Sequence, residues 1–295
     1  MNKIGLIIGF GSIGSQHHKA MIKSKLFKKI YILSKHYKKI NHIRNLKEIK
    51  SINPDLVVIC SETSAHFKQL KYIEKNLFKK IILVEKPLFS KTQKLTIKNN
   101  KVYVGYNLRY DPMLQYIKKF ISKKKIITTS ITCNSYLPGW RSRDYKKIYS
   151  SYKNMGGGVH LDLSHEIDYT NWIFEGFKKN TLTLKKISNL KIDSYDYLDL
   201  SGTSKFSKII NIKLNYFSIK NKRNIEIIID NEVINVDLIK RTIEFSNLRR
   251  NIIKKFKKIS SIERMVFQLK DIFNNKPYSA CSYDDGLNVL KMLGV

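Results

Sequence analysis

A glycine-rich turn near the start of the chain constrains its fold more than any other feature. The apolar run Ile4–Ile8 leads directly into GFGSIG at residues 9–14, and a segment with a helical pattern follows. Glycines at this spacing allow a tight turn, admit a pyrophosphate close to the backbone and let the helix pack on the strand. The turn therefore predicts a dinucleotide site at the helix N-terminus. The predicted phosphate-binding residues are Gly9, Gly11, Ser12, Ile13 and Gly14.

Further apolar runs of strand type follow, separated by helical segments such as Ala65–Lys75. The runs are Ile30–Leu33, Leu56–Cys60, Ile81–Val84 and Val102–Val104. Strands that alternate with helices predict a doubly wound parallel sheet, a Rossmann domain spanning residues 1–110. Ligands of such sheets bind beyond the carboxyl ends of the strands. We therefore expect cofactor contacts from Ser34, Lys35, Thr63, His66, Glu85, Lys86 and Asn107.

The end of the second strand bears on the choice of dinucleotide. An acidic residue at this point binds the ribose of NAD, but this chain has Ser34 and Lys35 there. A hydroxyl group and a cation suit a 2′-phosphate, which favours NADP over NAD. The alternative is that both are ordinary turn residues of a lysine-rich chain.

A second glycine-rich stretch, GGGVHLDLSHEID at residues 156–168, carries the candidate acid–base groups. Apolar residues recur at helical spacing after it, and this spacing predicts a helix with Asp162, His165, Glu166 and Tyr169 on neighbouring positions. A carboxylate beside an imidazole can move a proton at neutral pH. The alternative is a helix start with an acidic residue near its dipole and a solvated histidine.

Five motifs occur in an order that resembles the Gfo/Idh/MocA family of NAD(P)-dependent sugar and polyol oxidoreductases. They are GFGSIG, ETSAH, EKP, GYNLRYDP and GGGVHLDLSHEID. The resemblance implies that Lys86 binds near the nicotinamide and assists proton transfer, and that Asp162 and His165 hold the substrate hydroxyl, with His165 as the base. Many members place this Asp and His four residues apart, whereas here they are three apart, which leaves the division of roles open.

Residues 111–295 are expected to form a second, α+β domain for substrate binding and oligomerisation. Successive strand-like runs between residues 181 and 245 suggest a mostly antiparallel, open sheet, with a hairpin turn at Asp230 and Asn231. Helices are expected at Met113–Ile121, Ile262–Phe273 and Tyr283–Leu293. The basic segment Arg249–Lys258 is interpreted as a solvated loop or helix face. The family resemblance implies a homo-oligomer, a dimer or a tetramer, formed through the sheet.

The loop Tyr136–Tyr145 is the candidate for substrate specificity. Trp140 offers a flat face to a sugar ring, and Arg141 or Arg143 can grip a carboxylate or phosphate. A subunit-contact or surface loop is an equally good interpretation. Arg109 and Tyr169 complete the predicted substrate-binding set.

Composition limits the class of protein. The formal net charge of +33 invites a nucleic-acid interpretation, but the lysines are spread along all 295 residues and no basic–aromatic RNA motif occurs. Scattered Cys60, Cys133 and Cys281 fit a reducing cytosol, and no apolar run approaches the roughly 20 residues of a membrane span. We therefore expect a cytoplasmic protein with neither a specific nucleic-acid partner nor a membrane partner.

These observations predict an NAD(P)-dependent enzyme that interconverts a secondary alcohol and a ketone on a sugar, sugar acid or polyol. The motif resemblance extends to enzymes of surface-polysaccharide sugar synthesis. No metal site is expected, because the spacing of His160, Asp162 and His165 is not that of the HExxH helix. Two alternatives stay open: a catalytically silent dinucleotide-binding regulator, and a basic nucleic-acid-associated protein.

Overall fold

A seven-stranded sheet forms the centre of the first of two structural units in the computed structural model, which describes residues 2–35, 37, 39–122 and 124–295. The strand order is β15-β6-β5-β4-β1-β2-β3, with every neighbouring pair parallel except β15 with β6. Strand order reverses at β1, which lies between β2 and β4, as in a doubly wound fold. The strands are β1 (Lys3–Ile8), β2 (Phe27–Leu33), β3 (His42–Ile43), β4 (Leu56–Ile59), β5 (Ile81–Val84), β6 (Lys101–Val104) and β15 (Cys281–Ser282).

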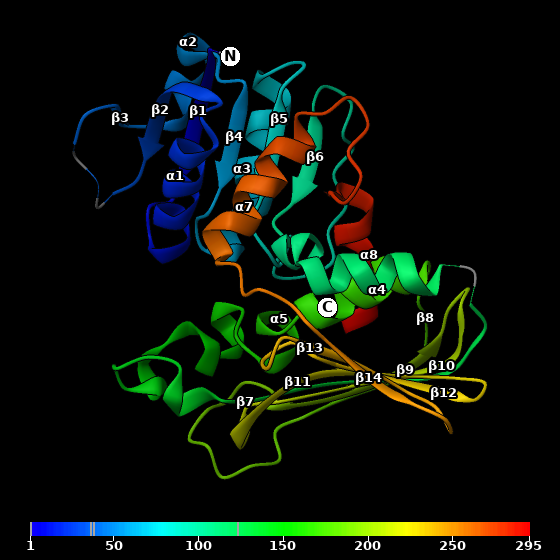
Figure 1. Cartoon of the computed structure of the whole chain (residues 1–295). Coiled ribbons are helices and arrows are strands. Elements are labelled where there is room, and N and C mark those ends of the chain that lie inside the picture. The colour runs from blue at the N-terminus through cyan, green and yellow to red at the C-terminus, as the bar shows by residue number, and fades with distance from the viewer. Residues whose placement is uncertain (1, 36, 38, 123) are drawn as a thin grey trace. The chain divides into compact units, whose positions relative to one another are not determined.

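Helices on the two faces of this sheet bury its apolar strands, and β4 is buried along its whole length (Figure 1). Parallel strands that are covered on both faces have apolar residues at successive positions, and such runs can be recognised in the sequence. The helices of this unit are α1 (Ser12–Ser24), α2 (Ile49–Ile52), α3 (Thr63–Asn76), α7 (Ser261–Ile272) and the start of α8 (Tyr283–Leu293).

Helix α7 lies beside α1 in the first unit, although the sequence analysis assigned both C-terminal helices to residues 111–295. Ser260 and Glu263 form a capping box that starts α7, and its apolar side includes Met265 and Leu269. These residues join Met21 of α1 in one buried cluster. The first unit therefore comprises Met1–Tyr110, Ile259–Leu290 and Val295, while Asp111–Lys258 and Lys291–Gly294 form the second.

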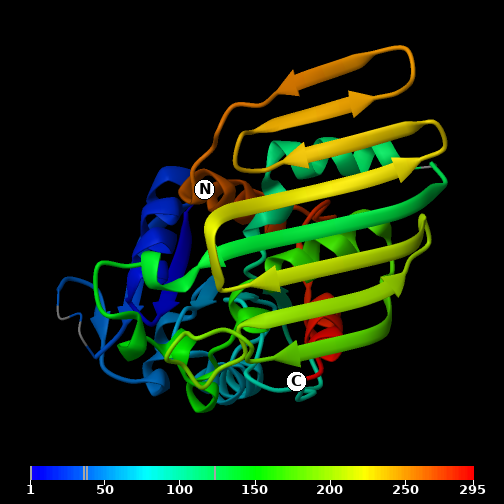
Figure 2. The same cartoon turned by 90° about the horizontal axis from the view of Figure 1, so that it is seen from below.

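The second unit is built on an eight-stranded sheet in the order β14-β13-β12-β11-β7-β10-β9-β8 (Figure 2). All neighbouring pairs are antiparallel except β10 with β7. The strands are β7 (Ile126–Tyr136), β8 (Lys178–Lys185), β9 (Tyr197–Thr203), β10 (Ser207–Asn215), β11 (Phe217–Ile229), β12 (Glu232–Asp237), β13 (Thr242–Ser246) and β14 (Asn251–Lys255). The helices are α4 (Pro112–Ile121), α5 (Val159–Asp162) and α6 (His165–Phe174).

One face of this sheet is buried and the other is polar. Along β7 the buried residues alternate with partly exposed threonine, serine and asparagine, as an open sheet requires. The expected hairpin turn is present, with Asn231 at φ 58 between β11 and β12. The predicted fold class is thus confirmed: a Rossmann-type parallel sheet together with a mostly antiparallel open sheet.

Two local predictions were wrong. The single helix expected after the second glycine-rich stretch is two helices, because α5 ends at Asp162 and α6 begins at His165. The basic segment expected as a loop or helix face contains the strand β14, which is exposed at all five residues. Within the described part of the chain, no helix is both long and apolar enough to cross a bilayer.

Candidate functional site

The glycine turn of the first unit has the backbone that its sequence predicts. Gly9 has φ +91, and a Cβ on it would lie 2.6 Å from the Ser61 nitrogen. A Cβ on Gly14 would lie 2.1 Å from the Gly9 oxygen, so the packing of α1 on the turn requires glycine here. At Gly11, by contrast, a Cβ would meet nothing within 4 Å. The first and third glycines therefore close the turn, and the second leaves open space above it.

The start of α1 fits a phosphate group. Gly11 caps the helix without a side-chain hydrogen bond, and the first turn carries no acidic residue. The first amides of a helix lack intrahelical acceptors and lie at the positive end of its dipole. Ser12 and Ile13 are both exposed at this end. The open space at Gly11 and these amides together suit the pyrophosphate of a dinucleotide.

The two residues predicted to read the 2′-position directly follow β2. Lys35 is exposed and Ser34 is partly buried, while the Ser34 carbonyl oxygen lies 3.2 Å from His42 Nε2. Nearby, the Phe10 ring of the glycine turn lies 4.7 Å from the Tyr37 ring. The aromatic pair packs the glycine turn against the segment after β2.

The end of β4 is joined to the end of β5 through a buried histidine. Thr63 begins α3, and His66 in its first turn is 1% exposed. Its Nε2 lies 3.1 Å from the Ser61 carbonyl oxygen and its Nδ1 lies 3.2 Å from that of Leu88. Burial lowers the pKa of His66, although both carbonyl groups and Glu85 act in the opposite direction. His66 thus holds the loop after β5 against the loop after β4.

Glu85 forms a buried pair with a histidine of α1. His17 Nε2 lies 2.6 Å from Glu85 Oε1, and the His17 side chain is fully buried. The Lys86 backbone nitrogen donates a hydrogen bond to Glu85 Oε2 at 3.0 Å. A Cβ on Gly105 would lie 2.7 Å from Glu85 Oε1, so Gly105 makes room for the carboxylate. The pair links the helix of the glycine turn to the segment that carries Lys86.

The balance of burial and hydrogen bonding determines the charge of Glu85. Burial acts to raise its pKa, but the hydrogen bond and charge of His17, with Lys86, lower the pKa below its usual value. The carboxylate is therefore ionised at neutral pH. It in turn helps burial to raise the pKa of the Cys60 thiol well above its usual value.

The remaining predicted residues of the first unit differ in accessibility. Lys86 is partly buried and precedes a cis peptide bond to Pro87. Asn107 is 8% exposed. Arg109 was predicted to bind substrate, but it is 2% exposed and its Nη1 lies 3.1 Å from Asp285 Oδ2. Its guanidinium group therefore joins the segment after β6 to the start of α8.

In the second unit, two tyrosines hold Asp162. The Tyr149 hydroxyl donates to Asp162 Oδ1 at 2.7 Å, and the Tyr216 hydroxyl donates to Oδ2 at 2.5 Å. Burial, then the charge of Asp162, raises the pKa of both hydroxyl groups. Both tyrosines therefore stay protonated and act as donors, and they hold the carboxylate in one orientation.

His160 lies beside this cluster in an apolar environment. It is 4% exposed, its ring lies 5.6 Å from that of Tyr195, and its buried Nδ1 has no hydrogen-bond partner among the described residues. Gly158 has φ +129, and a Cβ there would lie 2.7 Å from the imidazole. Burial lowers the His160 pKa to about 4, with Asp162 opposing the change. His160 is therefore neutral at pH 7.

The residues that follow Asp162 have separate environments. His165 begins α6 and is partly buried. The neighbouring Glu166 is fully buried, and Arg223 Nε donates to its Oε1 at 2.5 Å. Tyr169, predicted to contact substrate, is 0% exposed. The break between α5 and α6 thus separates Asp162, with its tyrosine partners, from Glu166, which pairs with an arginine of β11.

The predicted specificity loop is partly anchored. Trp140 Nε1 donates to Ser135 Oγ at 2.5 Å, and its ring meets the edge of Tyr216 at 5.2 Å. The Arg141 guanidinium lies 5.9 Å from the Tyr149 ring centre. Arg143 is exposed. Trp140 and Arg141 are therefore next to the two tyrosines that hold Asp162.

The sequence analysis missed His17, Tyr149 and Tyr216. His17 follows the glycine turn by three residues, but nothing in its neighbours indicates a carboxylate partner 68 residues away. Tyr149 and Tyr216 are separated from Asp162 by 13 and 54 residues. No local spacing links such residues, and only folding brings them together.

Comparison with known proteins identifies the first unit. Residues 4–99 match the family model GFO_IDH_MocA, described as an oxidoreductase family with an NAD-binding Rossmann fold. Over these residues the chain is similar to the Gfo/Idh/MocA family. This family is one of NAD-binding oxidoreductases, as the glycine turn predicted. No curated protein sequence matches the chain at a significant level.

Solved structures share the fold of the whole chain. Levoglucosan dehydrogenase in complex with NADH matches with a TM-score of 0.85 at 16% identity, over 100% of this chain and 95% of that one. UDP-N-acetylglucosamine 3-dehydrogenase from Acidithiobacillus ferrooxidans matches with a TM-score of 0.77 at 15% identity, over 99% and 96%. A super-repressor mutant of Gal80p from Saccharomyces cerevisiae matches with a TM-score of 0.81 at 14% identity, over 100% and 94%. At these identities the likeness shows a shared fold and nothing more.

Proposed function

We propose that this protein oxidises a secondary alcohol of a sugar, sugar acid or polyol, or reduces the corresponding ketone, with NADP or NAD. The observation that carries the proposal is the vacant space over Gly11 at a helix start without acidic residues, in a segment that matches an NAD-binding oxidoreductase family. The sugar dehydrogenases of the same fold support the substrate class.

In this proposal each unit contributes a different part of the chemistry. The bound nicotinamide supplies the hydride acceptor or donor. Lys86 contacts the cofactor, and its backbone nitrogen donates to the Glu85 carboxylate, which helps to hold the segment in place. His165 takes the proton of the substrate hydroxyl, because an imidazole exchanges protons near neutral pH. Asp162, with both oxygens held by tyrosines, orients the substrate or the base.

The other residues predicted to contact the cofactor or the substrate are supported to different degrees. Ser34 and Lys35 favour NADP, and no acidic residue stands at these two positions. Trp140 and Arg141 lie near Asp162 and remain the candidates for substrate recognition, while Arg143 is exposed beside them. Arg109 and Tyr169 are buried, and their contact with substrate stays a prediction. A cytoplasmic homo-oligomer with a role in surface-polysaccharide sugars stays a prediction.

A purified-enzyme assay tests the proposal. We expect absorbance at 340 nm to change when NADP or NAD is mixed with a panel of sugars, sugar acids and nucleotide sugars. Lys86→Met and His165→Gln should each lower kcat at least 100-fold, because each removes a group that can transfer or stabilise a proton. Lys80→Met, an exchange of another lysine near β5, is the matched control and should retain activity.

The regulator alternative predicts a different result. A super-repressor mutant of Gal80p shares the fold, which favours keeping this candidate. A regulator would bind NADPH in a fluorescence titration but turn over no member of the panel. Such a result for the wild-type protein would replace the dehydrogenase proposal.

A further inference from the structure

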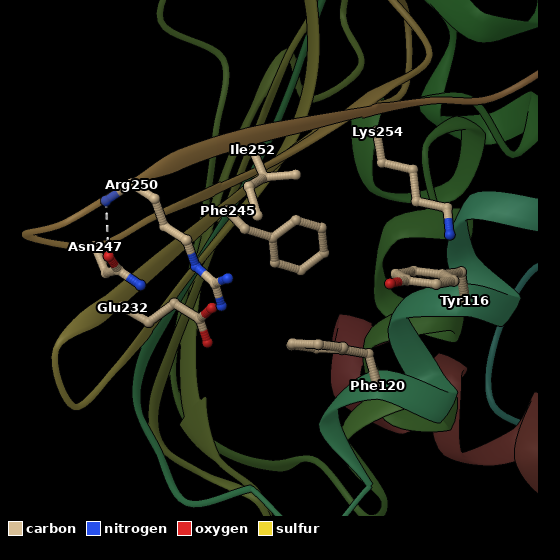
Figure 3. A pocket seen from close by; sticks show the side chains of 8 residues that line it. All are labelled: Tyr116, Phe120, Glu232, Phe245, Asn247, Arg250, Ile252 and Lys254. Carbon is tan, nitrogen blue, oxygen red and sulfur yellow. Dashed lines mark hydrogen bonds between the residues drawn. The ribbon is translucent and has the colours of Figure 1, made fainter.

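A groove of about 340 Å³ lies in the second unit between α4 and the hairpin formed by β13 and β14 (Figure 3). None of the residues that line this hairpin groove belongs to the predicted cofactor or substrate set. The side chains that line it are Tyr116, Phe120, Glu232, Phe245, Asn247, Arg250, Ile252 and Lys254.

Sheet register and helix spacing create the aromatic floor of the groove. Phe245 pairs with Ile252 across the hairpin, so their side chains project from the same face of the sheet. Tyr116 and Phe120 are four residues apart on α4, and their rings are stacked at 6.1 Å. The Phe245 ring lies 5.0 Å from that of Phe120. An apolar side chain of a ligand would therefore meet aromatic rings from both elements.

Cations border this floor, and within the described residues two of them, Lys254 and Arg250, form no ion pair with a carboxylate. Lys254 Nζ lies 4.2 Å from the centre of the Tyr116 ring. Lys124 lies 3.5 Å from Glu232 and thus balances the acidic residue of the groove. Arg250 forms no ion pair within the part of the chain that the structure describes. The groove therefore has an unbalanced positive charge.

Arg250 belongs to the less common type of basic residue in this chain. Lysine dominates the 56 basic residues, so a charged surface in this chain is ordinarily a lysine surface. Arg109, Arg223 and Arg241 each pair with a carboxylate. Arg249 and Arg250 stand together at the hairpin turn and are exposed. Arginine and lysine both bind carboxylates, so Arg250 and Lys254 favour acidic groups of a ligand at this surface.

The edge of the sheet supplies a second means of binding. β14 is the last strand of its sheet and has only β13 as a neighbour. Alternate backbone N–H and C=O groups on its outer side can therefore accept another strand. Side chains of an added strand opposite Ile252 and Lys254 would lie on the groove face, and those opposite Ile253 and Lys255 on the other face.

We propose that the hairpin groove and β14 bind an acidic peptide segment of another protein as a ninth, antiparallel strand. Read against β14, the segment has two acidic residues opposite Lys255 and Lys254, then two apolar residues opposite Ile253 and Ile252. The second apolar residue enters the aromatic floor, and the second acidic residue lies on the same face beside it. The proposal does not depend on the oxidoreductase function.

A labelled peptide tests this arrangement. Gly-Ser-Glu-Glu-Val-Phe-Ser-Gly with an N-terminal fluorescein should bind the full-length protein in a fluorescence-anisotropy titration at 150 mM salt. A peptide with the central order Val-Phe-Glu-Glu keeps the composition but sets each acidic residue opposite an isoleucine. We expect it to bind at least 10-fold more weakly. Methylation of the four central backbone nitrogens should weaken binding similarly, because it removes strand donors without altering the protein.

Two charge-reversal variants identify the surface. Lys254→Glu/Lys255→Glu should raise the Kd at least 10-fold, whereas Lys257→Glu/Lys258→Glu makes the same change in net charge outside β14 and should raise it less than 3-fold. Equal losses from both variants, or equal affinity for the two peptide orders, would show charge attraction alone and overturn the proposal. The proposal would also be overturned if the wild-type protein did not bind the peptide at concentrations up to 1 mM. It would be overturned as well if DNA or anionic vesicles displaced the peptide to the same extent from both charge-reversal variants.

Discussion

Glu85 and His160 show opposite ways in which burial controls a titratable group. Glu85 remains charged because His17 and the Lys86 amide stabilise its anion. His160 becomes neutral because its ring is desolvated and its Nδ1 has no partner among the described residues. A buried charge with partners and a buried base without them respond differently to substitution and to pH.

The two members of the His17–Glu85 pair should be energetically coupled, so that removing both costs less than the sum of removing each alone. His17→Leu leaves the Glu85 carboxylate buried without its main partner and should lower the free energy of unfolding by about 3 kcal/mol. His17→Leu/Glu85→Leu should cost less than the sum of the two single changes. Urea titrations of the four proteins complete this double-mutant cycle. Strict additivity would show that the pair is not coupled.

His160 should make the second unit acid-sensitive between pH 6.5 and about 4. In this window the unfolded chain binds a proton that the folded chain excludes, so stability falls as the pH falls. A pKa reduction of this size corresponds to about 3 kcal/mol across the full window. His160→Phe keeps an aromatic ring beside Tyr195 and should flatten this dependence, measured as urea unfolding at pH 7 and pH 4.5.

His66 provides the comparison for that experiment. Its pKa is also lowered, but its ring lies within hydrogen-bonding distance of two carbonyl oxygens. His66→Phe loses those contacts and should destabilise the first unit at both pH values. If His160→Phe kept the full wild-type pH dependence, another group would be responsible for it.

At the scale of elements, α1 connects the glycine turn to the rest of the first unit. Its N-terminus faces the open space at Gly11, while Ala20 and Met21 pack with α7 in the core. His17, between these two parts, contacts Glu85 after β5. One helix thus carries the candidate phosphate site, a core contact and the buried pair.

Two glycines of the turn should respond differently to alanine. Gly11→Ala meets no atom within 4 Å and should change the free energy of unfolding by less than about 0.5 kcal/mol. It should nevertheless raise the Kd for NADPH at least 10-fold, because the methyl group occupies space needed by the pyrophosphate. Gly14→Ala sets a Cβ 2.1 Å from the Gly9 oxygen and should destabilise the fold. Thermal melts and fluorescence titrations measure both effects, and unchanged NADPH binding by Gly11→Ala would place the phosphates elsewhere.

For the whole molecule, the net charge of +33 is the dominant long-range property. Basic residues are distributed through both units, so their combined field attracts polyanions without reading a sequence. This field explains why the net charge alone invites a nucleic-acid interpretation, although residues 4–99 match an oxidoreductase family.

Binding to DNA should therefore be strong only at low salt. We expect duplexes of two unrelated sequences to bind with equal affinity at 50 mM salt, and both affinities to fall by about 10³-fold or more at 200 mM, because binding releases counterions. Anisotropy titrations measure this effect. A sequence preference that survives 200 mM salt would favour the nucleic-acid alternative.

The sequence predicted correctly those structural features that depend on residues close together in the chain. It predicted five of the seven strands of the Rossmann sheet, the glycine turn and the hairpin at Asn231, all of which follow from local patterns, but it missed the two-residue strands β3 and β15. It was wrong about residues 163–164, where the helix breaks, and about β14. β14 lacks the alternation of a half-buried strand because all five of its residues are exposed, so no pattern marked it.

By itself, the sequence determined the class of the first domain, because backbone geometry at three glycines and continuous apolar strands are local requirements. Only the tertiary structure decided the partners: His17 with Glu85, Tyr149 and Tyr216 with Asp162, and Arg109 with Asp285. The physical reason is that the pairing of a buried polar group depends on which distant side chains lie in the same buried space. The spacing of residues along the chain does not predict those neighbours.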